Sequence, residues 1–347
     1  MKSFAELLEE KLRQPFWRKG QKCYPSASTQ AVYRRKLKPF VALHGHLPIA
    51  DIPESAYADW FTELEKKYKQ GHLAIIRSKM NAVLNYAVKV RALDRNPLES
   101  LRPYSQEPDQ IVPADPRHVA AIIQACQDLS RSSNPLNRRD AAIMIFGIGG
   151  LRPSNIGAAS LSLTMAAFAN PLWDEDGQQA FYAVAVGGKQ DMECVLLESD
   201  REIVESWLDC RPFTVHDSLF INMNADENTN HGRYLEPLTV EGLGNVRKRV
   251  CVFARVPLIS FQRLRVRVGT RAAQISNSSE RAGQVLGHSR SSGGRVVRGH
   301  YWDVDKHRSR KLAAQIRREV QSTPIEVPDL TEKFQQIEIQ PNKRISA

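Results

Sequence analysis

The sequence predicts a mainly helical protein of two domains, with a small β-sheet in the second. Three observations support this class. Apolar residues recur at three- and four-residue spacing over most of the chain, residues 179–197 alternate as strands do, and a proline-containing segment separates two helical regions. A chain of 347 residues is long enough for two domains that each bury a core.

The first region is expected to contain three helices. A helix over residues 28–43 carries basic side chains on the face opposite its apolar residues. A second helix is expected after Asp51, with Pro53 in its first turn, where proline is tolerated. A third extends from about residue 75 to residue 93 and stops before Asn96-Pro97. The basic face is compatible with a bundle that binds nucleic acid. The alternative is a plain helical bundle whose lysines are solvated.

A linker is expected where prolines replace the helical pattern. Prolines cannot extend a helix and favour extended backbone, and this stretch holds Pro103, Pro108, Pro113 and Pro116. We therefore expect a first domain at residues 1–102, a linker at 103–116, a second domain at 117–321 and a C-terminal tail at 322–347.

The second domain is expected to begin with a helix capped by Asp115-Pro116. An apolar helix over residues 141–148 should end at Gly149-Gly150, because paired glycines permit a tight turn. Residues 179–197 are typical of a hairpin whose turn contains Lys189. Further helices are expected at residues 200–209, 238–253, 258–273 and 305–321.

Charge and cysteine usage narrow the class of protein. The chain has 49 Lys and Arg against 38 Asp and Glu, a net charge of +11 that is typical of nucleic-acid binders without proving that role. Five scattered cysteines without a Cys-x-x-Cys pair argue against a disulfide framework and a zinc site. The N-terminus lacks the apolar run of a signal peptide, and no stretch reaches membrane-span length. We expect a cytoplasmic protein without a membrane partner.

Five residues form an ordered constellation along the second domain: Arg152, Lys189, Arg265, His288 and Tyr301. Taken singly, each has a structural explanation. Arg152 could pair with a carboxylate, Lys189 could be solvated on a turn, and Tyr301 could pack in the core. Together they provide cations for a phosphate, a proton donor and a phenol.

These residues resemble those of the tyrosine recombinases, the family of phage integrases and Xer-type recombinases. The segments that carry the resemblance are Gly150-Leu151-Arg152, the hairpin lysine Lys189, Leu264-Arg265, Leu286-Gly287-His288 and Tyr301. The resemblance implies a helical core-binding domain and a catalytic domain that together clamp DNA. Tyr301 is the only tyrosine after Arg265 and therefore the only residue that fits the family's nucleophile position.

The resemblance also implies a role for each residue. Arginine stays protonated and offers a planar fork of donors, so Arg152 and Arg265 suit the charge that develops on a phosphate under attack. Lys189 would protonate the departing 5′ oxygen, because the pKa of a buried, crowded lysine falls readily. His288 would donate to a non-bridging oxygen or help to position Tyr301.

The sequence departs from the family pattern in two places. Gln262 stands three residues before Arg265, where the family usually has histidine. A glutamine amide can donate a hydrogen bond but cannot act as a base. The spacing from His288 to Tyr301 is also longer than usual, with the extra residues in Ser291-Ser292-Gly293-Gly294.

The function implied by the resemblance is site-specific DNA recombination through a 3′-phosphotyrosyl intermediate. The expected partners are double-stranded DNA, a homo-tetramer on two DNA sites and accessory DNA-bending proteins. No cofactor and no metal are expected, because a phosphotyrosyl bond has about the energy of the phosphodiester that it replaces. The alternatives are a type IB topoisomerase and a non-catalytic DNA-binding relative. A two-metal nuclease is disfavoured because the acidic clusters lie in turn-like sequence.

Overall fold

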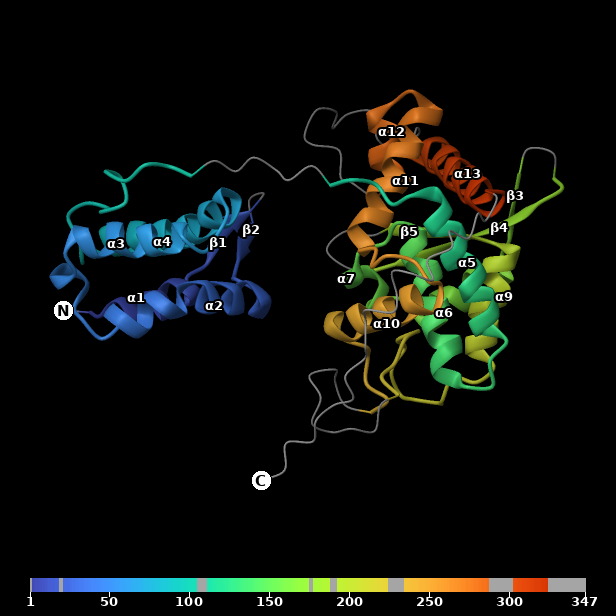
Figure 1. The fold of residues 1–347 in the computed structure, drawn as a ribbon, viewed down its shortest axis with the longest axis horizontal. Helices are drawn as coiled ribbons and strands as arrows, with labels where there is room; N and C mark the ends of the chain where they lie inside the picture. Colours follow the sequence, from blue (N-terminus) through green and yellow to red (C-terminus); the bar gives the residue numbers. More distant parts are fainter. Residues whose placement is uncertain are drawn as a thin grey trace. The chain divides into compact units, whose positions relative to one another are not determined.

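The computed structural model describes residues 2–18, 21–104, 111–174, 177–187, 192–223, 234–286 and 302–323. The chain forms two compact units, Met1–Gln110 and Ile111–Ala347, and each has its own hydrophobic core (Figure 1). The expected mainly helical fold with a small sheet is confirmed. Among the described helices, none has both the length and the apolar character needed to cross a bilayer.

The first unit packs helices around an aromatic centre. Its elements are α1 (Phe4–Arg13), β1 (Phe16–Arg18), β2 (Gln21–Cys23), α2 (Ala27–His44), a 3-10 turn (Ile49–Asp51), α3 (Glu54–Glu65) and α4 (Gln70–Lys89). The ring centroid of Phe40 on α2 lies 4.9 Å from that of Phe4, and 5.1 Å from those of Tyr57 and Trp60. Such edge and stacked contacts stabilise the core beyond simple burial of area.

The helices of the first unit confirm the prediction in type and correct it in extent. Helix α1 was not expected; Ser3 and Glu6 form its capping box. Helix α4 begins at Gln70 rather than near residue 75 and ends at Lys89 rather than at residue 93. Its end is marked by Arg91 in the left-handed conformation (φ 59°), a position where sequence rules look for glycine.

The second unit surrounds one central helix and carries a three-stranded antiparallel sheet of order β3-β4-β5. Its helices are α5 (Pro116–Ser130), α6 (Pro135–Ile148), α7 (Pro153–Ile156), α8 (Leu161–Ala169), α9 (Glu198–Leu208), α10 (Val240–Phe253), α11 (Phe261–Ser276), α12 (Ser279–Val285) and α13 (Trp302–Gln321). Its strands are β3 (Leu172–Trp173), β4 (Ala180–Val186) and β5 (Met192–Leu197).

The central helix, α6, starts earlier than its apolar run. Asn134 caps it, and residues 139–148 are buried on every side. Arg139 and Asp140 belong to this buried stretch and form an ion pair of 2.9 Å. The apolar run in the sequence predicted this helix over residues 141–148 only. That bound is wrong because the charges neutralise each other inside the core.

The expected hairpin is confirmed, with Val184 paired to Cys194 in the β4–β5 register. The helices expected at 200–209, 238–253, 258–273 and 305–321 correspond to α9, α10, α11 and α13, with ends displaced by up to about three residues. Elements too short to show a clear period were not expected, namely α7, α8, α12 and β3.

The boundary between the units falls within the expected linker, 103–116. On its N-terminal side, the ring of Tyr104 contacts that of Phe61 in a tilted arrangement, and Tyr104 donates a hydrogen bond of 2.8 Å to Glu65. On its C-terminal side, Arg263 donates to the carbonyl oxygen of Val112, at 3.0 Å. Residues near both ends of the segment are therefore held by their own unit. The tail from residue 324 onward lies outside the described residues.

Candidate active site

Arg265 is the buried arginine of α11, with 3% of its surface exposed. Its Nη1 donates to the carbonyl oxygen of Gly150 at 2.7 Å and lies 3.7 Å from the sulfur of Met192. Its Nη2 donates to the carbonyl oxygen of Leu286 at 2.5 Å. One guanidinium therefore joins the turn after α6, the start of β5 and the end of α12.

The turn after α6 sets the position of Arg152. Gly149 ends the helix and Gly150 adopts φ +88°, a conformation that favours glycine. Arg152 follows as the N-terminal capping residue of α7 and is partly exposed. No hydrogen bond or ion pair joins its side chain to another residue of the described ranges.

Arg152 and Arg265 lie close enough for their charges to interact. Burial first, and then the charge of Arg152, lower the pKa of Arg265 to about 10. Arg265 therefore remains protonated near neutral pH. Among the described residues, no carboxylate pairs with either arginine, so the two cations form an electropositive site that favours an anion.

The hairpin is fixed at this site by both ends of its turn. Asn155 on α7 is buried, and its Nδ2 donates to the carbonyl oxygen of Gly187 at 3.0 Å. Met192, at the other end, contacts Arg265. Lys189 lies between Gly187 and Met192 in the sequence, but it is outside the described residues. Neither Asn155 nor Met192 was picked out from the sequence, because neither residue type carries a signal for such a contact.

The end of α12 is held against α11 by a close approach. A Cβ at Gly269 would lie only 2.6 Å from Cδ1 of Leu286, so a larger residue there would force the Leu286 side chain to move. His288 follows Leu286 by two residues, and Tyr301 directly precedes α13 in the sequence. Both lie outside the described residues, so their contacts remain predictions.

Gln262 is located in the first turn of α11, three residues before Arg265, and its side chain is exposed. Residues three apart lie on neighbouring positions of a helix face. The structure thus places three of the six predicted site residues, Arg152, Arg265 and Gln262. The two arginines lie close enough for their charges to interact, and Gln262 is exposed one helical turn before Arg265.

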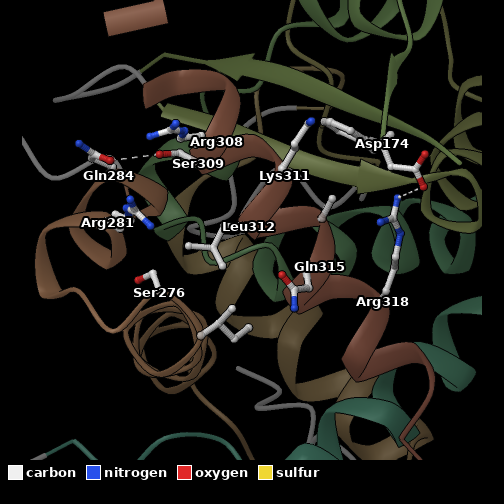
Figure 2. A pocket seen from close by; sticks show the side chains of 13 residues that line it. Asp174, Ser276, Arg281, Gln284, Arg308, Ser309, Lys311, Leu312, Gln315 and Arg318 are labelled. Carbon is white, nitrogen blue, oxygen red and sulfur yellow. Dashed lines mark hydrogen bonds and ion pairs between the residues drawn. The ribbon is translucent and has the colours of Figure 1, made fainter. Parts of the chain in front are cut away.

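A separate cavity of about 580 Å³ lies between α13, α12 and the C-terminal end of α11 (Figure 2). Its rim is basic, with Arg281, Arg308, Lys311 and Arg318, and Arg318 forms a 3.7 Å ion pair with Asp174. None of the predicted site residues lines it.

No protein-family model and no curated protein matches the chain. Solved structures do. A lambda integrase dimer bound to a COC′ core site aligns with a TM-score of 0.52 and 15% identity, over 91% of this chain and 93% of that chain. The Tn1549 transposon integrase in complex with circular intermediate DNA gives 0.54 and 14%, over 90% and 99%. XerH site-specific recombinase bound to palindromic difH substrate gives 0.55 and 15%, over 82% and 78%.

These similarities show that the chain has the fold of the tyrosine recombinases. The fold expected from the resemblance of Gly150-Leu151-Arg152, Leu264-Arg265 and Leu286-Gly287-His288 is therefore confirmed. At identities of 14–15%, the comparison concerns the fold alone.

Proposed function

We propose that this protein is a site-specific DNA recombinase that cuts and rejoins DNA through a 3′-phosphotyrosyl intermediate. The observation that carries the proposal is the arrangement around Arg265. A buried guanidinium without a carboxylate partner among the described residues lies near a second arginine. It is bonded to the segments that precede His288 and flank Lys189.

The arrangement suits attack on a phosphodiester. The phenol of Tyr301 loses its proton to solvent and its oxygen forms a bond to phosphorus, while the bond from phosphorus to the 5′ oxygen breaks. Arg152 and Arg265 stabilise the charge on the non-bridging oxygens, an effect worth roughly 2.7–4 kcal/mol for each preorganised donor. Lys189 gives the departing 5′ oxygen its proton, and His288 donates to a non-bridging oxygen or positions Tyr301. Attack by a 5′ hydroxyl of the second DNA reverses these steps.

The partners follow from the same proposal. Two duplexes must be cut and exchanged, so the working assembly is a homo-tetramer on two DNA sites, joined by accessory DNA-bending proteins. Lambda integrase has been solved as a tetramer bound to a Holliday junction, which supports this stoichiometry. The first unit binds DNA as a core-binding domain, and the tail, 322–347, docks on a neighbouring subunit.

The direct test uses nicked suicide DNA that carries the sequence flanking the protein's own gene. Wild-type protein should form a covalent adduct and recombinant junctions, whereas Tyr301→Phe should bind the DNA and form neither, because only the attacking oxygen is lost. Tyr234→Phe is the matched control, since Tyr234 is an exposed tyrosine of the same unit. An adduct formed by Tyr301→Phe would refute the assignment. Adducts and supercoil relaxation without junctions would instead indicate a topoisomerase.

A further inference from the structure

The first two residues of β5 contact two different parts of the second unit. Met192 contacts Arg265 through its sulfur. Glu193 accepts two hydrogen bonds from Arg310 on α13, from Nε and from Nη2, each of 2.6 Å. Successive side chains of a strand point to opposite faces, so one strand end holds the phosphate-facing arginine on one side and α13 on the other.

Helix α13 matters because it begins one residue after Tyr301. Of its side chains from residue 308 onward, whose burial the structure describes, the buried ones lie between Ala314 and Val320. Within that stretch, Arg317 forms a buried ion pair with Asp200, with distances of 2.8 and 2.6 Å. Of the side chains described between residues 308 and 313, none is fully buried.

One side of α13 borders the basic cavity. Arg308, Lys311, Leu312 and Gln315 line that cavity (Figure 2). On this side Leu312 also packs against the small apolar cluster of Ala272, Ala282 and Ile316, and Ser309 donates a hydrogen bond of 3.3 Å to Gln284 on α12. The N-terminal half of the helix is therefore attached to α12 on one side and to β5 on the other, where Arg310 donates two hydrogen bonds of 2.6 Å to Glu193.

Because the buried anchor lies near the C-terminal end of α13, a small tilt of the helix displaces its N-terminal end by a much larger distance. At 1.5 Å per residue, Trp302 lies about 22 Å from the buried anchor at Arg317 and about 12 Å from Arg310. A tilt of about 5° about that anchor would displace the first residue of the helix by roughly 2 Å. Displacement by about 1 Å can reduce a reaction rate on the order of 100-fold.

We propose that the Glu193–Arg310 ion pair is a positioning device for the nucleophile. It holds the N-terminal half of α13 against β5 and so fixes Tyr301 relative to Arg265. This inference rests on the proposed function, because it gives Tyr301 the role of nucleophile. Both side chains of the pair are about one-fifth exposed, so the pair acts on geometry more than on global stability.

The test compares Glu193→Gln, Arg310→Gln and the charge-reversed double variant Glu193→Arg/Arg310→Glu. Each is measured for adduct formation at saturating suicide DNA, for DNA affinity and for melting temperature. The single variants should form the adduct about 10- to 100-fold more slowly, while the affinity for DNA stays within about twofold of wild type. The double variant should recover part of the lost rate, which a merely structural disturbance would not do.

A second ion pair of the same helix provides the control. Arg271 on α11 holds Glu319 near the far end of α13, at 2.6 and 3.1 Å. Glu319→Gln should leave the rate of adduct formation within about twofold of wild type, because it lies on the other side of the anchor from Trp302.

Hydrogen exchange gives a readout that does not need activity. Glu193→Gln should increase amide exchange over residues 302–310 but not over residues 314–320. Unchanged exchange, or an unchanged adduct rate in both single variants, would overturn the inference. Wild-type protein that forms no Tyr301 adduct would refute the proposed function and the positioning role with it. A selective change in exchange would then show only that the pair holds the helix.

Discussion

The two units differ in where they keep charge. In the described part of the first unit every charged side chain is at least partly exposed, and the buried polar residue there is Asn96. The second unit buries the charged residues Arg139, Asp140, Asp200, Arg265 and Arg317. Burying a charge is costly unless a partner compensates it. At these five positions of the second unit, the placement of the groups around the charge therefore matters more than the amount of surface buried.

The buried charges of the second unit are themselves of two kinds. Arg139 pairs with Asp140 and Arg317 pairs with Asp200, so these four charges are compensated by protein. Arg265 is held by two carbonyl oxygens and a sulfur, which carry no full charge. The difference separates charges that are compensated within the protein from a charge that the described residues leave without a counter-charge.

The largest effect on stability is expected at the compensated pair of Asp200 and Arg317. Asp200→Asn leaves the buried arginine without its counter-charge, which should reduce the free energy of unfolding of the second unit by about 3–5 kcal/mol. Denaturant unfolding followed by circular dichroism measures this change. A loss below about 1 kcal/mol would mean that this buried pair contributes no more to stability than an exposed ion pair does.

The largest effect on chemistry is expected at the uncompensated Arg265. Arg265→Lys keeps the charge but loses the planar fork that reaches Gly150 and Leu286 together. Single-turnover cleavage should fall about 100- to 1,000-fold, while DNA binding persists. Arg267→Lys is the matched control on the same helix, since Arg267 bonds the carbonyl oxygen of Ala114 instead. An equal loss of cleavage rate in both variants would mean that Arg265 contributes no more to the reaction than Arg267.

A smaller effect is expected at Gln262, whose side chain is exposed. Its contribution can only be hydrogen bonding, so Gln262→Ala should reduce transition-state stabilisation by roughly 0.5–1.5 kcal/mol. Gln262→His should retain activity and add a pH dependence near the imidazole pKa, visible in cleavage rates between about pH 5.5 and 9. Inactive wild-type protein that gains cleavage only as Gln262→His would instead identify a decayed enzyme.

The smallest effect is expected in the first unit. Glu9 on α1 and Arg34 on α2 form an exposed ion pair of 2.7 Å. Glu9→Gln should reduce the free energy of unfolding by less than about 1 kcal/mol, because solvent and salt screen such pairs. The same denaturant experiment measures it. A loss as large as that of Asp200→Asn would erase the contrast between the two units.

The sequence allowed most of the architecture to be predicted, because long helices have a visible period. It also allowed the turn at Gly149-Gly150 to be predicted, and the structure shows φ +88° at Gly150. It did not reveal the contacts of Arg265. Carbonyl oxygens of Gly150 and Leu286 belong to the backbone, and no residue type marks them as acceptors.

Pairings between distant residues were equally invisible. Asp200 and Arg317 are separated by 117 positions, and nothing in either local sequence indicates the other. The start of α6 was missed for a related reason, since the apolar run from residue 141 does not reveal that the charged pair before it, Arg139 and Asp140, is also buried. Local periodicity thus predicts elements, while compensated charge must be found in the folded structure.

The most direct test of the central claim is to identify the residue and the DNA end that become joined. Wild-type protein trapped on suicide DNA is digested with protease and nuclease, and the cross-linked peptide is identified by mass spectrometry. The account predicts a peptide containing Tyr301 that carries a nucleotide through its 3′ phosphate. A cross-link at another residue, a link to a 5′ phosphate, or cleaved DNA without any covalent peptide would contradict it.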